Sequence, residues 1–150
     1  MAVALPQRST MIRLLPPGGV ETGLCHERFQ LPARGTSVAA ARRRVRVHLP
    51  AWGFCADLCD AVELVISELV TNALVHTASE QILCVLRAEA EVLYVEVADQ
   101  GGGPVGPSAR QAGAGDESGR GLMLVCALVD AWGDRPAAGG GRVVWARLRR

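Results

Sequence analysis

The feature that most constrains the fold is a stretch from Cys55 to about Thr77 that contains neither glycine nor proline. Its apolar residues recur at intervals of three and four, which is the spacing of one face of an α-helix. A helix of this length and apolar content has to be covered over most of its surface by other parts of the chain. The sequence therefore predicts a long, largely buried helix at the centre of the fold.

The rest of the chain predicts further elements around this helix. Thr36 and Ser37 precede an alanine-rich segment that ends by Pro50, which indicates a capped first helix. A third helix is expected after the last glycine cluster of the central region, at Leu122–Ala131. Strand-forming residues predict five strands: Arg28–Leu31, Gln81–Arg87, Val92–Ala98, Trp132–Arg135 and Arg142–Leu148.

The order of these elements predicts one α/β domain. Helices and strands alternate in blocks, with a β-hairpin in the middle instead of repeated βαβ units. We therefore expect a two-layer sandwich, in which a mixed, mostly antiparallel sheet carries helices on one face. Residues 1–25 combine proline, glycine and isolated apolar residues without periodicity, so we expect a poorly ordered extension before a domain over residues 26–150.

Composition and charge narrow the class of function. No apolar run approaches the roughly 20 residues of a membrane span, and prolines interrupt the N-terminal segment, so we expect a cytoplasmic protein without membrane contact. All 16 basic residues are arginine and the net charge is +1, so the global charge does not indicate direct nucleic-acid binding. The arginine run at 42–46 could contact phosphate or an acidic partner, but a solvated helix face is the favoured interpretation.

The 5 cysteines lie within apolar helix or strand patterns and include no Cys-x-x-Cys pair. We interpret them as reduced core thiols. Cys55 and Cys59 are one helical turn apart and His48 lies upstream, but two thiols and one uncertain further ligand do not complete a tetrahedral zinc site. A metal site at these residues is the disfavoured alternative.

A polar stripe runs along the long helix. Glu68, Asn72 and His76 follow one another at intervals of four residues, so each is displaced by only about 40° around the helix axis. A carboxylate and a carboxamide on a buried helix need partners, because each unsatisfied group costs about 1–3 kcal/mol. Bound Mg²⁺ and phosphate would supply them. From this helix alone, the favoured alternative is that Glu68 pairs with an arginine and Asn72 caps a neighbouring loop.

Two glycine-rich turns follow the hairpin. Alternation along its second strand places Asp99 at the strand end, on the face that the helices are expected to cover. The glycines after it let a flat ligand approach, and a carboxylate there can accept a hydrogen bond from the amino group of adenine. Gly119, Arg120 and Gly121 open a helix, whose free N–H groups and positive dipole end favour phosphate. Each turn alone is also compatible with an ordinary turn or loop-to-helix junction.

Taken in this order, the three features resemble a known family. The matching motifs are the N box and the two glycine boxes of the histidine-kinase-like ATPase superfamily, carried here by Glu68 to His76, Asp99-x-Gly101-x-Gly103 and Gly119-x-Gly121-Leu122. The resemblance covers roughly residues 28–148. The short chain and the Glu-x-x-Thr-Asn form of the N box are similar to the anti-sigma-factor serine/threonine kinases of Gram-positive bacteria.

The resemblance implies a site for ATP and Mg²⁺. Asn72 would coordinate Mg²⁺ beside the phosphates, Glu68 would polarise an attacking hydroxyl, and Asp99 would bond the adenine amino group. The other positions implied to bind nucleotide are Thr71, Gly101, Gly103, Gly119, Arg120, Gly121, Leu122 and, in the first helix, Arg42.

One position departs from the family. The last strand usually carries a threonine beside the adenine-binding aspartate, and this chain has Arg142-Val143-Val144 there. With Val143 in place of the threonine, we expect weaker nucleotide binding.

Two functions are compatible with the resemblance. The first is a serine/threonine protein kinase that phosphorylates a small anti-sigma-factor antagonist with Mg-ATP as donor. The second is an ATP-dependent module that binds a sigma factor or another protein partner with little or no turnover. Glu68 favours the kinase, because binding alone does not need a carboxylate aimed at the γ-phosphate. A homodimer is compatible with either function.

Overall fold

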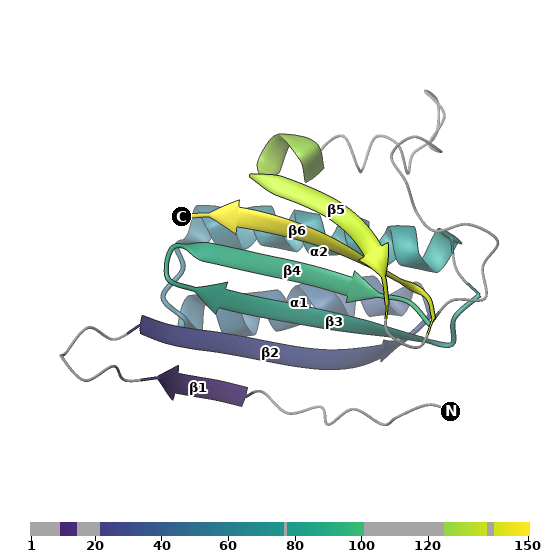
Figure 1. Cartoon of the computed structure of the whole chain (residues 1–150), viewed down its shortest axis with the longest axis horizontal. Coiled ribbons are helices and arrows are strands. Elements are labelled where there is room, and N and C mark those ends of the chain that lie inside the picture. Colours follow the sequence, from purple (N-terminus) through teal and green to yellow (C-terminus); the bar gives the residue numbers. More distant parts are fainter. Residues whose placement is uncertain (1–9, 15–21, 77, 101–124, 138–139) are drawn as a thin grey trace.

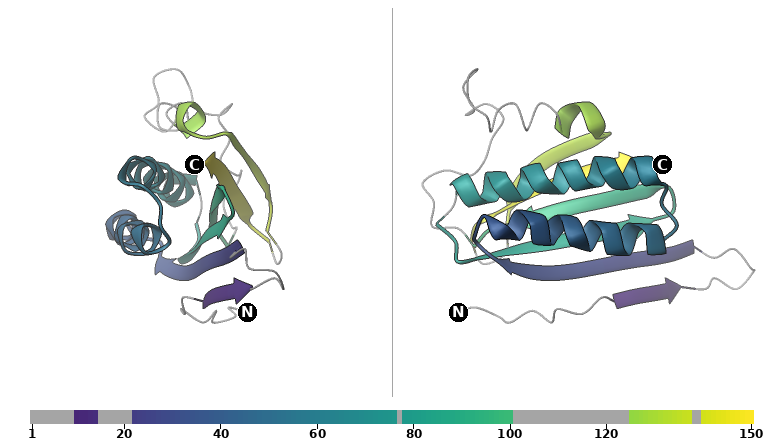
Figure 2. Two further views of the ribbon diagram at one scale, coloured as in Figure 1. Left: turned by 90° about the vertical axis from the view of Figure 1, so that its left-hand side faces the viewer. Right: turned by 180° about the vertical axis from the view of Figure 1, so that it is seen from behind.

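The computed structural model of the chain describes residues 10–14, 22–76, 78–100, 125–137 and 140–150. The described helices and strands follow the order β1 (Thr10–Leu14), β2 (Thr22–Pro32), α1 (Thr36–Ala51), α2 (Ala56–His76), β3 (Gln81–Glu89), β4 (Val92–Ala98), β5 (Ala131–Pro136) and β6 (Arg142–Arg149). The strands form one sheet in the order β1-β2-β3-β4-β6-β5, in which each described pairing is antiparallel (Figure 1). Both helices lie on the same face of this sheet (Figure 2). The predicted two-layer α/β sandwich is confirmed.

Helix α2 matches the prediction for the central helix closely. Its sheet-facing side is buried in the core, through Val62, Val65, Ile66, Leu69, Val70 and Ala73. Fully burying one such aliphatic side chain contributes about 1.5–3 kcal/mol, so rotation of α2 about its own axis is strongly disfavoured. The directions of the polar residues on the same helix are fixed by this packing. Among the described residues, no helix is both long enough and apolar enough to cross a membrane.

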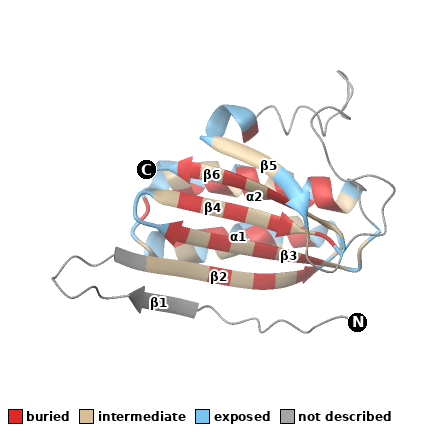
Figure 3. Ribbon diagram, viewed as in Figure 1, coloured by how far each residue is buried: buried red, intermediate tan, exposed pale blue. Residues whose placement is uncertain are grey.

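The predicted hairpin is formed by β3 and β4. Buried and half-buried residues alternate along both strands, as the banding in Figure 3 shows. Leu93, Val95 and Val97 point toward the helices and are buried, and Asp99 continues the same alternation one step past the end of β4. The predicted placement of Asp99 on the helix-covered side is therefore confirmed.

The N-terminal part of the domain differs from the expectation. Thr10–Leu14 forms a strand inside the segment expected to be an extension, and β2 begins at Thr22 and not at Arg28. The predicted short edge strand is wrong, because β2 lies between β1 and β3 and pairs with β3 from Leu24 to Pro32. This order comes from pairing with residues far away in sequence, which local pattern does not reveal.

Two helix boundaries also differ. Ser37 does not cap α1: the N-cap is Gly35 without a side-chain cap, and the Ser37 hydroxyl donates a hydrogen bond to the carbonyl of Pro32. The third helix was expected to cover Leu122–Ala131. In the described part of this segment, residues 125–128 are helical and Ala131 begins β5. The Asp130 N–H already donates to the Arg147 carbonyl at 2.8 Å, so pairing with β6 draws this segment into the sheet.

A buried carboxylate ties α1 to the sheet. Glu27 of β2 is fully buried, and its Oε1 lies 3.1 Å from Nη1 of Arg44 and 3.4 Å from Nε2 of His48, both on α1. Arg44 also stacks over the ring of Phe29, 5.3 Å from its centroid. The interpretation of the arginine run as a solvated face therefore fails for Arg44, which neutralises a buried charge.

This contact leads to a prediction about stability. Arg44→Met keeps much of the packing but removes the cation next to buried Glu27, so we expect the free energy of unfolding to fall by about 1–3 kcal/mol. Arg43→Met is the matched control, because Arg43 is exposed on the same helix; we expect it to change stability by less than about 0.5 kcal/mol. Urea unfolding of both variants measures the difference, and equal losses would contradict the role of Arg44.

Candidate functional site

Two of the predicted site residues lie at the same end of the sandwich. Asn72 is one turn before the end of α2, and Asp99 directly follows β4. The C-terminal ends of α2 and β4 lie at the same end of the sheet in Figure 1 and from behind in Figure 2. The fold thus brings together the N box and the first residue of the first glycine box.

Asn72 is buried without hydrogen bonds to the described part of the chain. The residue is 4% exposed, and neither Nδ2 nor Oδ1 of its side chain has a hydrogen-bond partner there. An unsatisfied buried polar group costs about 1–3 kcal/mol. A carboxamide in this state fits a ligand that supplies the missing partners, and its oxygen is a ligand type that Mg²⁺ accepts.

Glu68 lies one turn before Asn72 on the same stripe. Its carboxylate is half-buried and makes no hydrogen bond or ion pair with the described residues. Burial raises the pKa of Glu68 above its usual value. The expected alternative, in which an arginine pairs with Glu68, is not found within the described residues. A partly desolvated carboxylate without a cation next to it is a stronger proton acceptor than a solvated one.

Glu68 also borders a surface groove. This groove has a volume of about 410 Å³ and is lined by residues of α1 and α2, namely Arg42, Asp60, Glu63, Leu64, Ser67 and Glu68. The carboxylate of Glu68 is thus accessible from outside the domain, whereas Asn72 is enclosed. A group brought from solvent through the groove could meet Glu68 beside the buried amide.

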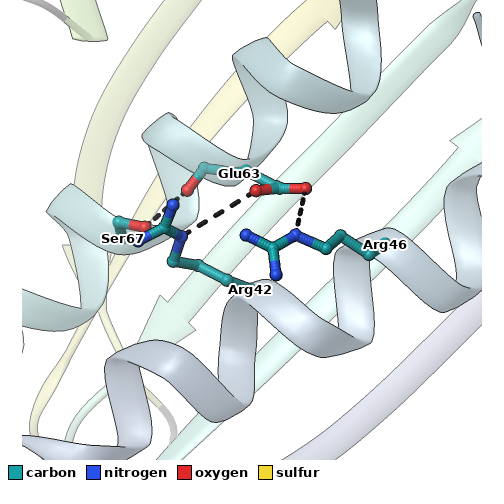
Figure 4. A network of polar contacts seen from close by, with 4 residues as sticks. All are labelled: Arg42, Arg46, Glu63 and Ser67. Carbon is teal, nitrogen blue, oxygen red and sulfur yellow. Dashed lines mark hydrogen bonds and ion pairs between the residues drawn. The ribbon is translucent and has the colours of Figure 1, made fainter. Parts of the chain in front are cut away.

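Arg42 lies on this groove within a polar network (Figure 4). Its Nε is 3.8 Å from Oε2 of Glu63, and the other carboxylate oxygen accepts a 2.7 Å hydrogen bond from Nε of Arg46. The Ser67 hydroxyl donates to the Glu63 carbonyl at 2.6 Å. Sequence reasoning missed this network, although the spacing of Glu63, Ser67 and Thr71 on one side of the helix was visible.

Thr71 points away from Asn72. It is exposed, and its hydroxyl donates to the Ser67 carbonyl at 2.7 Å. Neighbouring residues of a helix are separated by about 100° around its axis, so Thr71 and Asn72 face different surroundings. The assignment of Thr71 to the nucleotide site stays a prediction.

Asp99 extends the pairing between β4 and β6. Its N–H donates to the Arg142 carbonyl at 3.0 Å, and the Arg142 N–H donates to Oδ1 of Asp99 at 3.3 Å. Arg142, the first residue of β6, therefore holds Asp99 at the end of the sheet. Asp99 is the residue to which the family resemblance assigns adenine binding. Asp99 itself is 9% exposed.

The register of β6 shows where Val143 lies relative to Asp99. Val143 pairs with Ala98, so it lies on the opposite face of the sheet from Asp99. Arg142, not Val143, is the β6 residue opposite Asp99, and its Nη1 is 3.0 Å from Oδ2 of Asp134. Arg142 is therefore the residue of β6 beside Asp99, and the assignment of the family's threonine position to Val143 stays a prediction.

The remaining predicted residues cannot be placed. Gly101, Gly103, Gly119, Arg120, Gly121 and Leu122 lie outside the described residues. Within the described part of the chain, no group of three or more His, Cys, Asp or Glu side chains could hold a metal ion. The thiol of Cys59 is buried and its pKa is raised by burial, with smaller contributions from neighbouring acidic groups.

Comparison with known proteins decides the family. A family model described as the histidine kinase-like ATPase domain matches residues 31–148. The chain belongs to this family. No curated protein matches the sequence. Membership in the histidine kinase-like ATPase family supports an ATP-binding, regulatory role for the chain.

Proposed function

We propose that this histidine kinase-like ATPase domain is a serine/threonine protein kinase of the anti-sigma-factor type, with a small anti-sigma antagonist as its protein substrate. The observation that carries the proposal is the pair of Glu68 and Asn72 on one side of α2. One is a desolvated carboxylate without a cation and the other a buried amide without partners among the described residues. Both states are costly for folding and useful for phosphoryl transfer.

The residues fit the ligands that the family implies. Oδ1 of Asn72 would hold Mg²⁺ together with the phosphates, and the carboxylate of Asp99 would accept a hydrogen bond from the adenine amino group. The bound nucleotide supplies the phosphoryl group, and the metal neutralises part of the phosphate charge. Asp99 orients the base at the sheet end, while Asn72 orients the phosphate end.

Glu68 would act as the general base. A serine or threonine hydroxyl of the partner approaches through the groove between α1 and α2, where Glu68 is accessible. In a transfer of the γ-phosphoryl group to this hydroxyl, with ADP as the leaving group, the carboxylate of Glu68 would accept the hydroxyl proton. Burial raises the pKa of Glu68 and so strengthens it as a base, as long as the pH stays above that pKa.

A partner-capture experiment tests the proposed kinase. The tagged protein is used to recover partners with Mg-ATP and with chelator, and each recovered protein is then tested for phosphate transfer. We expect a small partner that binds with Mg-ATP and becomes phosphorylated on serine or threonine. Stable capture without any transfer would favour the second function, an ATP-dependent partner-binding module.

One observation favours that second function. The family's usual threonine beside the adenine-binding aspartate is absent, and Arg142 lies opposite Asp99 instead. Loss of a hydroxyl donor weakens binding by roughly 0.5–1.5 kcal/mol. A domain with a weakened nucleotide site could sense ATP without turning it over quickly.

The adenine assignment leads to a specific prediction. Asp99→Asn retains an oxygen that can accept from the Arg142 N–H, but it places an amide donor where the carboxylate would receive the adenine amino group. We expect affinity for ATP to fall about 10-fold or more, the effect of losing one hydrogen bond to a charged group. The preference for ATP over GTP should narrow, because the guanine carbonyl can accept from the new amide.

Calorimetry with ATP and GTP measures both changes, and thermal unfolding shows whether the fold is intact. A wild-type protein that binds ATP and GTP equally would remove the adenine role of Asp99.

A further inference from the structure

The sheet has a second face that no described helix covers. This open face points toward the viewer in Figure 1, with α1 and α2 behind the sheet. Along β3 and β4, every residue that points away from the helices is only half-buried, apart from the exposed Glu89 at the end of β3. The open face is therefore accessible over the middle of the described sheet.

Three basic side chains lie together on the open face. His26 of β2 is directly opposite Arg87 of β3, and Arg28 is opposite Val85, which is two residues from Arg87 on the same face. Directly opposite Cβ atoms are about 5 Å apart and diagonal neighbours about 7–8 Å apart. We call His26, Arg28 and Arg87 the basic cluster.

The basic cluster is not neutralised by the described part of the chain. Arg28 and Arg87 form no ion pair there, and the Nε atom of each is buried without an acceptor. Cζ of Arg87 lies over the ring of Tyr94, 4.5 Å from its centroid, a contact that leaves the charge of the guanidinium in place. Like charges in adjacent positions of a sheet are destabilising, so the cluster costs stability unless an anion binds it.

Other arginines of the same region are paired. Nη2 of Arg135 is 3.1 Å from Oε1 of Glu96, and Nη2 of Arg147 is 2.6 Å from Oδ2 of Asp130. Nε of Arg149 is 3.3 Å from the same oxygen of Asp130. Within the described residues, Arg28 and Arg87 thus differ from Arg135, Arg147 and Arg149 in having no acidic partner. The pKa of His26 is lowered by burial and by the charges of Arg28 and Arg87, against the weaker opposing effects of Glu27 and Glu96.

We propose that the basic cluster is a docking surface for an acidic segment of a partner protein, one that presents Asp or Glu side chains to Arg28 and Arg87. A sheet face with two arginines and a tyrosine has the composition of a protein-binding surface, in which Arg and Tyr are enriched. A second copy that presented the same surface fits less well, because its Arg28 and Arg87 would face the same two arginines.

Nucleic acid also fits less well. Duplex DNA carries one negative charge about every 1.7 Å and needs several phosphate contacts along a continuous path. On the open face, Glu89 and Glu96 lie on the same two strands as Arg87 and Tyr94, and the whole chain has a net charge of only +1. Localised carboxylates match a localised cluster better than a continuous polyanion does.

The docking surface lies on the other side of the sheet from Glu68, Asn72 and Asp99. An acidic partner segment and a nucleotide could therefore occupy the domain at the same time. This inference does not depend on the proposed kinase activity, and the two can fail separately.

The test uses the full chain and a fluorescent peptide of alternating Glu and Ala residues. The controls are the same peptide with Gln in place of Glu, and a labelled oligothymidylate. Anisotropy titrations are made at low ionic strength and again at about 0.15 M salt, where charge interactions beyond about 8 Å are largely screened. We expect the Glu peptide to bind more tightly than either control.

Two double variants of equal charge locate the binding surface. Arg28→Gln with Arg87→Gln should weaken binding of the Glu peptide about 10-fold or more. Arg34→Gln with Arg43→Gln is the matched control, because both residues are exposed and make no ion pair with the described residues; it should change binding less than about twofold. If the first double variant unfolds, Arg28→Gln alone is used and should weaken binding in the same direction. ATP affinity should be unchanged in every variant.

Histidine titration by NMR gives an independent measurement. Saturating Glu peptide should raise the pKa of His26, because the added carboxylates offset the charges of Arg28 and Arg87. The proposal is overturned by an unchanged pKa of His26 at saturation, by equal losses in the two double variants, by tighter binding of oligothymidylate, or by no binding of the Glu peptide.

Discussion

Glu68→Gln is expected to leave Mg-ATP affinity nearly unchanged while phosphate transfer to the protein partner falls about 100-fold or more. The substitution keeps the shape of the side chain and removes its capacity to accept a proton. Glu68 makes no hydrogen bond or ion pair with the described residues that the amide would break, so a loss of folding would not explain a large decrease in transfer. The measurement compares ATP affinity, partner affinity and single-turnover transfer for the two proteins.

The pH dependence gives a second readout of the same prediction. Burial raises the pKa of Glu68 from its usual value of 4.5, so transfer by the wild-type protein should decline as the pH falls through this raised pKa. The Gln variant should lack this acidic limb. Because the raised pKa means that the ionised form is disfavoured in the folded state, the contribution of Glu68 to stability decreases as the pH rises through the folded pKa. At neutral pH the Gln variant should therefore be at least as stable as the wild type.

Asp60→Asn is the matched control for this experiment. Asp60 lines the same groove on the same helix and is exposed, so the variant changes the groove charge equally. We expect it to alter transfer by only a few-fold. An equal loss in both variants would assign the effect to groove charge and not to a base. If the wild-type protein binds Mg-ATP and its partner but transfers no phosphate over hours, the proposed kinase activity is contradicted and the ATP-dependent partner-binding module is favoured.

The elements that were predictable from the sequence are those with strong local signals. The glycine- and proline-free stretch became α2 within a residue of its predicted start, and the strand-forming runs became the β3–β4 hairpin. In both cases the pattern of apolar residues also fixes which side faces the core. For this reason the burial of Asn72 and the side of the sheet occupied by Asp99 could be expected before the structure.

The features that the sequence did not reveal depend on contacts between distant segments. The length of β2 is set by its pairing with β3, and the β5 strand that replaces the end of the third helix is set by β6. The position of Arg142 opposite Asp99 is likewise a matter of strand register. A shift of one residue in register exchanges the two faces of a strand. The sequence alone therefore could not show whether Arg142 or Val143 lies opposite Asp99.

The charged residues show the same limit. Arg44 belongs to a run that is usually solvated, and only the position of β2 under α1 brings buried Glu27 within 3.1 Å of it. Arg28 and Arg87 are 59 positions apart in the chain and become neighbours through the β2–β3 pairing. The roles of the glycine boxes, in contrast, stay predictions of the family resemblance, because these residues lie outside the described part of the chain.

The second large effect is expected at Asn72. Asn72→Ala should abolish the increase in ATP affinity that Mg²⁺ produces, so that the variant binds ATP equally well with magnesium and with chelator. The reason is that a protein-bound Mg²⁺ keeps few side-chain ligands, and Asn72 is the side chain that would hold it here. Calorimetric titration of both proteins under the two conditions measures the effect. A variant that keeps the full magnesium effect would place the metal elsewhere.

Stability separates this role from a structural one. If Asn72 capped a neighbouring loop, its removal would destabilise the protein without ligand by about 0.5–2 kcal/mol. Its amide atoms are instead buried without partners among the described residues, a state that itself costs about 1–3 kcal/mol. Asn72→Leu, which fills the space with an apolar side chain of similar size, should therefore leave the ligand-free protein as stable as the wild type or more stable. The same variant should lose the magnesium effect and most of the stabilisation by Mg-ATP, since a ligand stabilises the folded state by RT ln(1 + [L]/Kd) and a higher Kd lowers this value. If Asn72→Leu lowers the free energy of unfolding of the ligand-free protein, Asn72 stabilises the fold itself, and its assignment as a ligand-binding residue is contradicted.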